Sequence, residues 1–158
     1  MKLIPLTNST EFAIIDDEDF YKVIKLSEVW NIQIYRNKPK AIFIRRNNIT
    51  IYLHRFVMGL GKDNGYDIDH ISHNIFDNRK ENLRIATFSQ NQMNKGKYKN
   101  NRSGHKNIRW HIQNENWNVY AVKDKKQHSF GSYETLEEAI KVRNIEIPKL
   151  HGEFARLD

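Results

Sequence analysis

The chain of 158 residues has a formal net charge of +7 and a pI near 9.5, and it contains no cysteine. This length suits one ordinary domain or two small modules, and the basic charge favours a polyanionic partner. Disulfides and thiolate-held zinc are excluded, so no structural zinc is expected. No apolar run approaches the roughly 20 residues that span a membrane, and the first residues lack a signal-peptide core. We therefore expect no membrane partner and a cytosolic or nucleoid location.

Residues 1–60 predict a small α+β leader that begins with a helix. An apolar run at 12–15 is followed by acidic residues, of which Asp16 or Asp17 is expected to cap a short helix that continues to Leu26. Trp30 is expected to close the core beneath this helix. The apolar positions with helical spacing are Phe20, Val23 and Ile24.

A small antiparallel sheet is expected in the second half of the leader. Stretches at 32–35, 41–44 and 49–53 are rich in β-branched and aromatic residues, and the polar turns NKPK and RRNN separate them. His54 is expected to begin a helix that leads into the next segment. Arg45, Arg46 and Arg55 can contact phosphates, but a solvated strand edge or an intramolecular ion pair explains them equally well.

Residues 66–94, YDIDHISHNIFDNRKENLRIATFSQNQMN, indicate a strand, a turn, a strand and a helix. They place Asp69 directly before His70, Asn82 twelve residues after this histidine, and Asn91 nine residues further on. An imidazole with a pKa of roughly 6.5 can accept a proton from water near neutral pH. Carboxylate and amide oxygens are hard ligands that suit Mg²⁺. The set is therefore suited to metal-assisted hydrolysis of a phosphodiester.

At these residues the chain resembles the HNH endonucleases, whose ββα-metal motif packs a β-hairpin on one helix with the metal between them. The resemblance implies that His70 is the general base that activates water. It also implies that Asp69 and Asn91 hold Mg²⁺ or Mn²⁺, and that Asn82 holds the hairpin loop and orients His70. DNA is the implied substrate, with 5′-phosphate and 3′-hydroxyl products.

Other residues of this stretch have a structural interpretation. Asn74, Asp77 and Asn78 are common turn residues and are assigned to the loop alone. A small residue, often glycine, usually stands at the position of His73, which is interpreted as an exposed loop side chain in preference to a further metal ligand or a phosphate contact. Because neighbouring side chains of a strand point to opposite faces, Asp69 and its neighbour can serve one site only if the strand ends, twists or bulges there.

Two further features flank the second predicted strand. Arg84 is the preferred candidate for stabilising charge on the phosphate, and Arg79 is the alternative. The helix after Ala86 is expected to be capped by Thr87 or Ser89.

A basic stretch, KGKYKNNRSGHKNIR, follows the motif without one acidic residue. Gly96, Ser103 and Gly104 favour a flexible linker, and Tyr98 offers a stacking face. A solvated linker would look similar, but the density of cations favours contact with a DNA backbone. The candidate DNA contacts of this stretch are Lys95, Lys97, Lys99, Arg102, Lys106 and Arg109.

Residues 105–158 predict a three-stranded antiparallel sheet packed on one helix. Strands are expected at 107–111, 117–123 and 126–130, joined by the turns QNEN and DKK. Thr135 and Glu138 have capping-box spacing, and an amphipathic helix follows that Pro148 should end or kink. The sheet face that this helix should cover carries Ile108, Trp110, Val119, Ala121, His128 and Phe130.

The motifs SGHKNIRW, FGSYETLEEA and LHGEFARLD make this part similar to the AP2 DNA-binding domain. In that family the sheet lies in the major groove of DNA. Neutral residues partly replace the family's Arg-rich face, so we expect phosphate anchoring rather than tight sequence specificity. The candidate contacts that the resemblance implies are Lys106, Arg109, His111, Asn118, Tyr120, Gln127 and Ser129.

Together these patterns predict an α+β protein with a leader at 1–60, an HNH motif at 61–95, a basic linker at 96–104 and an AP2-like domain at 105–158. The predicted function is a metal-dependent HNH endonuclease of homing or mobile-element type, acting on double-stranded DNA as a monomer or weak homodimer. Two other classes stay open: a non-catalytic AP2-like regulator with an HNH-derived scaffold, and an RNA-binding or RNA-processing protein. The joint presence of the Asp, His and Asn set favours the enzyme, and the lack of RNP-like aromatic motifs disfavours RNA.

Overall fold

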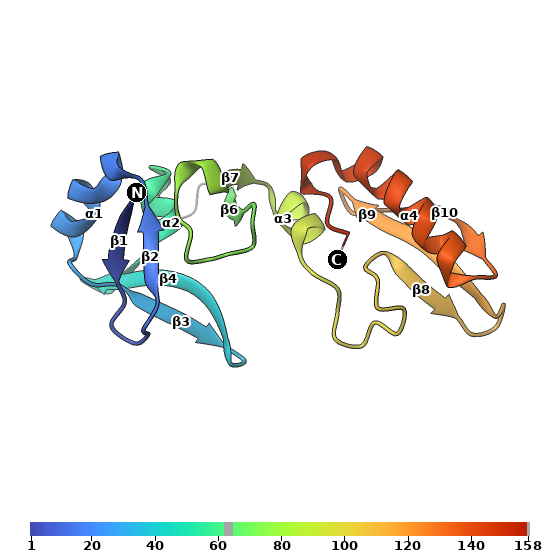
Figure 1. Ribbon diagram of the computed structural model, residues 1–158. Coiled ribbons are helices and arrows are strands. Elements are labelled where there is room, and N and C mark those ends of the chain that lie inside the picture. Colours follow the sequence, from blue (N-terminus) through green and yellow to red (C-terminus); the bar gives the residue numbers. More distant parts are fainter. Residues whose placement is uncertain (62–64, 158) are drawn as a thin grey trace. The chain divides into compact units, whose positions relative to one another are not determined.

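The computed structural model describes residues 1–61 and 65–157 and contains two compact units, Met1–Ala86 and Thr87–Asp158. Helices and strands occur in both units, which confirms the α+β class (Figure 1). Among the described residues, no helix combines the length and the apolar character needed to cross a membrane.

The first unit consists of small antiparallel sheets and short helices. β1 (Lys2–Pro5) pairs with β2 (Phe12–Ile15), and η1 (Asp17–Asp19) leads into α1 (Phe20–Leu26). β3 (Asn31–Tyr35), β4 (Lys38–Arg46) and β5 (Ile49–Tyr52) form the next sheet, and α2 (Leu53–Val57) follows it. The last hairpin joins β6 (Asp67–His70) to β7 (Leu83–Ala86), with η2 (Lys80–Asn82) in the loop between them.

One hydrophobic core holds the leader and this hairpin together. Trp30 is fully buried, as predicted, and packs against Phe56 with ring centroids 6.3 Å apart. Ile68 of β6 and Leu83 of β7 belong to the same buried cluster. Burial of such side chains contributes about 1.5–3 kcal/mol each. The leader therefore fixes the hairpin in place.

The acidic turn of the leader does not cap the first helix as predicted. Asp16 occupies the N-cap of η1, but its side chain makes no cap hydrogen bond, and Asp17 lies inside η1. Instead, Asp16 Oδ2 accepts a hydrogen bond from the backbone N–H of Lys80 at 2.8 Å. The ammonium group of Lys80 also pairs with Glu18 and, at 3.4 Å, with buried Asp19. The acidic turn thus binds η2, because an exposed backbone N–H and an ammonium group face it there.

The turn between β3 and β4 is shorter than predicted. Only Arg36 and Asn37 form it, with φ of 51° and 59°, and residues 38–40 lie in β4. Asn47 and Asn48 form the next turn, also at positive φ. Such two-residue turns match the twist of the paired strands. Lys38 therefore pairs directly with Tyr35 in the antiparallel hairpin.

The second unit contains the sheet and helix predicted for the last third of the chain. α3 (Phe88–Asn94) starts with a capping box between Thr87 and Gln90. β8 (Ile108–His111), β9 (Asn116–Lys123) and β10 (Lys126–Tyr133) form an antiparallel sheet in the order β10-β9-β8. α4 (Leu136–His151) packs on its Ile108 and Val119 face, and η3 (Gly152–Phe154) follows.

The limits of α4 test two predictions about capping and proline. The capping box of Thr135 and Glu138 is confirmed. Pro148 does not end the helix, which continues to His151 and stops at Gly152 with φ of 58°. A proline so near the last turn removes one backbone donor only. The glycine conformation at the C-cap therefore ends the helix instead.

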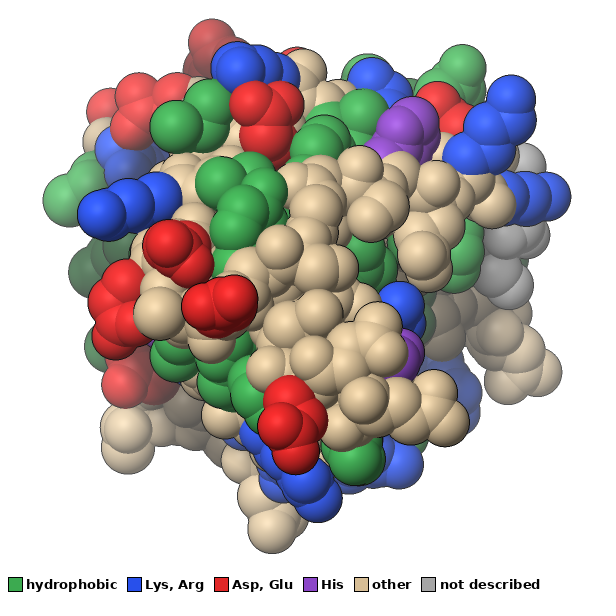
Figure 2. All heavy atoms as spheres, turned by 90° about the vertical axis from the view of Figure 1, so that its right-hand side faces the viewer, with side chains coloured by type: hydrophobic (Ala, Val, Ile, Leu, Met, Phe, Trp, Pro, Cys, Tyr) green, Lys and Arg blue, Asp and Glu red, His purple; other side chains and the backbone are tan. Residues whose placement is uncertain are grey.

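Charged side chains are unevenly distributed along the chain. On the face drawn in Figure 2, acidic and basic side chains both reach the surface, with uncharged side chains and backbone between them. In the sequence, residues 31–61 include arginine and lysine but no aspartate or glutamate, whereas residues 16–19 are all acidic. A polyanion is therefore expected to bind at particular basic segments.

Candidate active site

The β6–β7 hairpin brings Asp69 and His70 to the end of a strand. Asp69 lies opposite Arg84, and His70, the last residue of β6, lies opposite Leu83. Directly after His70 the chain turns, with the His73 N–H donating to the His70 carbonyl at 3.0 Å. Strand alternation therefore stops at this point, which is one of the conditions under which both side chains can serve one site.

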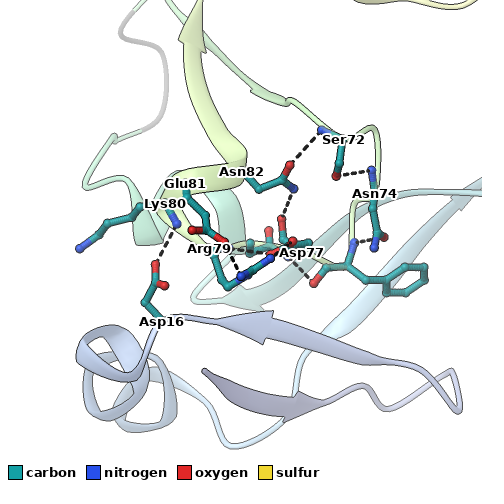
Figure 3. A network of polar contacts seen from close by, with 10 residues as sticks. Asp16, Ser72, Asn74, Asp77, Arg79, Lys80, Glu81 and Asn82 are labelled. Carbon is teal, nitrogen blue, oxygen red and sulfur yellow. Dashed lines mark hydrogen bonds and ion pairs between the residues drawn. The ribbon is translucent and has the colours of Figure 1, made fainter.

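Asn82 lies across the hairpin loop. Its Nδ2 donates to the Asp77 carbonyl at 2.7 Å, and its Oδ1 accepts from the Ser72 N–H at 2.9 Å (Figure 3). The side chain is 7% exposed. Because the two partners lie on opposite sides of the loop, one buried amide fixes its width.

The same loop is also held from outside by strand β2. The Ile14 N–H donates to the Phe76 carbonyl at 2.7 Å, and the Asn78 N–H donates to the Ile14 carbonyl at 2.8 Å. Inside the loop, the Arg79 guanidinium donates to both carboxylate oxygens of Asp77 at 2.7 and 2.8 Å (Figure 3). These bonds hold the pKa of Asp77 below its ordinary value. The loop beside His70 is therefore rigidly supported.

Asn78 orients the imidazole of His70. Its Nδ2 donates to the carbonyls of Ile75 and Phe76 at 2.9 and 3.2 Å, which fixes the direction of the amide. Its Oδ1 then lies 3.4 Å from Nε2 of His70, a long contact. Because an amide oxygen only accepts, this contact favours the neutral form of His70 with its proton on Nε2. Nδ1 is then the nitrogen with the lone pair.

The surroundings of His70 favour its neutral form. Burial lowers the pKa of His70 below its ordinary value of 6.5, although Asn78, Asp69 and Asp77 act in the opposite direction. A neutral imidazole with one oriented acceptor nitrogen is the form that a general base requires.

Arg84 is paired with the predicted metal ligand. Its Nε and Nη2 donate to Oδ2 of Asp69 at 2.9 and 2.8 Å, and Asp69 is 8% exposed. In this structure Arg84 therefore positions the carboxylate, while its role toward a phosphate stays a prediction. Arg79 pairs with Asp77 and Glu81, and His73 is exposed with φ of 62°, a conformation that explains why a small residue suits its position.

His54 is a neighbour of His70 that the sequence pattern did not reveal. It lies on α2, and its ring meets the ring of His70 edge to face with centroids 5.5 Å apart. Burial, the nearby His70 and Arg55 lower the pKa of His54 to about 3. Its Nδ1 is buried without a hydrogen-bond partner among the described residues. His54 is therefore a neutral ring that packs against His70. The only sequence signal for this contact is the position of His54 on the helix that precedes the HNH motif.

The carboxylate of Asp69 has the chemistry of a ligand for a hard divalent cation. An ionised carboxylate has about four lone-pair sites, so Asp69 can accept Arg84 and still bind a cation. Asn91, the other predicted ligand, lies on α3 in the second unit, and its role stays a prediction. Among the described residues, no group of three or more His, Cys, Asp or Glu side chains could hold a metal. The predicted ligands, Asp69 and Asn91, are one carboxylate and one amide, so they are not a group of that kind.

The predicted DNA contacts of the second unit lie in two settings. On the sheet face opposite α4, Arg109 pairs with Asn118, and its guanidinium stacks 4.7 Å above the ring of Tyr120, which pairs with Ser129. In contrast, the Lys106 ammonium donates to the Met93 carbonyl. The remaining candidates are placed as follows: Gln127 opposite Val122, His111 at the end of β8, Lys97 donating to the Gly104 carbonyl, and Lys95, Lys99 and Arg102 exposed.

Comparison with known proteins identifies the segment that carries the hairpin. A family model described as HNH endonuclease matches residues 52–93, which include α2, the hairpin and most of α3. Protein 3.8 of Escherichia phage T7 is 37% identical over 92 residues, covering 58% of this chain and 75% of that protein.

A second relative has the name of the matched family model, HNH endonuclease. A protein of Acanthamoeba polyphaga mimivirus, named as an uncharacterized HNH endonuclease, is 36% identical over 107 residues. The match covers 65% of this chain and 54% of the mimivirus protein, so the chain spans about half the length of that relative. No solved structure matches the chain significantly. The chain therefore belongs to the same family as phage T7 protein 3.8, and its residues 52–93 form an HNH endonuclease domain.

Proposed function

We propose that the chain is a divalent-metal-dependent endonuclease of homing or mobile-element type that hydrolyses phosphodiester bonds of double-stranded DNA. The observation that carries this proposal is the orientation of His70 in an HNH domain: Nε2 faces Asn78, so Nδ1 can accept a proton. Asp69 stands next to this base at the end of β6. A general base beside a carboxylate that can hold a metal ion suits hydrolysis of a phosphate ester.

In this proposal His70 removes a proton from the attacking water. Asn78 holds the tautomer, Asn82 holds the loop, and Arg84 holds Asp69. When bound by Asp69 and Asn91, Mg²⁺ or Mn²⁺ supplies positive charge that stabilises the phosphate in the transition state. General-base catalysis of this kind contributes roughly 10²- to 10⁴-fold to the rate.

Residues 105–158 are proposed to be an AP2-like DNA-binding domain, which the basic linker 96–104 joins to the HNH domain. Its sheet exposes Arg109 stacked on Tyr120 on the face opposite the helix, which suits contact with a phosphate or a base edge. A tethered second binding site raises the effective concentration of the nuclease domain at DNA. A regulator without catalysis would use the same surface, and only the chemistry at His70 separates the two functions.

The decisive experiment is nicking of supercoiled plasmid by the full chain in Mg²⁺ or Mn²⁺, with EDTA as the metal-free control. We expect His70→Ala to lower the nicking rate by about 100-fold or more. His73→Ala is the matched control, because this histidine lies three residues away and is exposed. Its rate should equal that of the parent.

Two outcomes would overturn the proposal. One is the absence of nicking by the parent with either ion, and the other is equal nicking by the parent and His70→Ala. If DNA binding persisted without nicking, the non-catalytic regulator would be the better description.

A further inference from the structure

The sheet formed by β3, β4 and β5 has one face that the core does not use. Ile42 and Ile44 of β4 are buried in the core of the first unit. Alternation then places Phe43 and Arg45 on the opposite face, and pairing adds Tyr52 opposite Phe43 and Thr50 opposite Arg45. We call this the outer face, and it consists of Gln33, Phe43, Arg45, Thr50 and Tyr52.

A row of aromatic rings connects the outer face to His70. The rings of Phe43 and Tyr52 are 6.5 Å apart, Tyr52 stacks on His54 at 5.8 Å, and His54 meets His70 at 5.5 Å. Phe43 is therefore within about 20 Å of His70, the length of roughly six base pairs of duplex. The outer face and His70 are therefore close enough for one duplex to contact both.

The charge of this region is complementary to a nucleic acid. Between residues 31 and 61 all formal charges are positive: Arg36, Lys38, Lys40, Arg45, Arg46 and Arg55. Arg45 is exposed, and among the described residues no ion pair involves it. An arginine without a carboxylate partner, placed between a threonine hydroxyl and aromatic rings, suits a backbone phosphate.

We propose that the outer face is the surface on which double-stranded DNA lies as it enters the site at His70, with Arg45 contacting a backbone phosphate. This inference rests on the proposed nuclease function, and it assigns the leader a binding role in addition to its support of the hairpin. Arg46, the next residue of β4, points to the other side of the strand and makes no such contact.

The neighbouring arginines provide a matched test. Binding of the full chain to a 30-base-pair duplex is measured by fluorescence anisotropy in EDTA, so that no cleavage occurs. Arg45→Gln should reduce the salt dependence of log K by about 0.9, the value for one lost phosphate contact. Between 50 and 200 mM salt, the parent should therefore lose about 3.5-fold more affinity than Arg45→Gln. Arg46→Gln removes the same charge and should keep the parent's salt dependence.

A second test locates the DNA on one face. Because the chain has no cysteine, a single cysteine can carry a photo-crosslinker at one chosen position. Thr50→Cys, on the outer face, should crosslink duplex DNA at least about five times more than Ile49→Cys, which faces the other side of β5 and is 56% exposed. His70→Ala is used as the background in this test so that the duplex stays intact.

The outcomes separate this inference from the nuclease proposal. Equal salt dependence of Arg45→Gln and Arg46→Gln, or equal crosslinking from both cysteines, overturns the outer face as a DNA surface, even if the protein nicks plasmid. A loss of binding by Arg45→Gln for duplex RNA but not for DNA would overturn it as well. The expected differences in a protein that never nicks plasmid would support the surface and defeat only the nuclease.

Discussion

The β6–β7 hairpin and the outward side of the β8–β10 sheet hold their polar side chains in opposite ways. In the hairpin, Asn78 and Asn82 are 1% and 7% exposed, and each amide bonds to backbone on more than one side. On the sheet, Arg109 is exposed and rests on the ring of Tyr120. A buried, fully bonded amide cannot adapt to a ligand, whereas an exposed guanidinium can. The hairpin is therefore suited to chemistry and the sheet to binding.

Among the residues that support the hairpin loop or lie on the sheet, replacement of Asn78 should give the largest change, and this change should affect the nicking rate alone. Asn78→Ala removes the acceptor that holds the proton of His70 on Nε2, and loss of such an orienting partner typically costs about 10- to 100-fold in activity. We expect the plasmid nicking rate to fall by this factor, with DNA affinity unchanged in EDTA. Asn118→Ala in the second unit is the matched control and should change affinity without changing the rate at saturating DNA. Reversal of these two patterns would invalidate the comparison.

His54 should make the first unit sensitive to acid. The pKa of His54 is about 3 in the folded state and 6.5 in the unfolded chain. Above pH 6.5 the imidazole is therefore neutral in both states, and its titration takes nothing from the free energy of unfolding. As pH falls from 6.5 toward 3, the unfolded chain binds a proton that the folded chain does not. Stability should then be lost by about 1.4 kcal/mol per pH unit from this group.

The measurement is urea unfolding at pH 7, 6 and 5. His54→Phe keeps an aromatic ring but cannot titrate, so its free energy of unfolding should fall less steeply with acid than that of the parent. Identical slopes for the two proteins would show that His54 is not buried as a neutral ring.

Arg109 should give the smallest effect, and it should affect affinity alone. Arg109→Ala removes one exposed cation from the sheet of the second unit, and we expect duplex affinity to fall about fivefold, or about 1 kcal/mol. The nicking rate at saturating DNA should stay at the parent value. A lower saturating rate would mean that the sheet takes part in the chemistry.

Much of the fold follows from local patterns in the sequence. The capping boxes at Thr87 and Thr135, the helix at His54 and the burial of Trp30 all agree with the structure, because each depends on residues close in sequence or on one strong apolar signal. The turn after Tyr35 was predicted to be longer than it is, because NKPK has the polar, proline-containing composition of a loop although its last three residues lie in β4.

The site was harder to predict where contacts are long-range. Asn78 was assigned to a turn, yet its amide faces His70, because strand β2 holds the Asn78 backbone from 64 residues earlier in the chain. Asp16 was assigned to a helix cap, yet it binds the backbone of Lys80. His54 and its contact with His70 depend on the packing of α2 against the hairpin. Such contacts come from tertiary packing, which spacing along the chain does not encode.

The protonation state of His70 decides whether this side chain can act as the general base. Long-range ¹⁵N–¹H correlation spectra of the histidine-labelled full chain, recorded at pH 7, distinguish the two neutral tautomers from the imidazolium form. The His70 signal is assigned by its absence in His70→Ala. We expect His70 to be neutral with the proton on Nε2, and we expect Asn78→Ala to disturb this preference. A His70 that carries its proton on Nδ1, or that is doubly protonated at pH 7, would rule out Nδ1 of His70 as the general base.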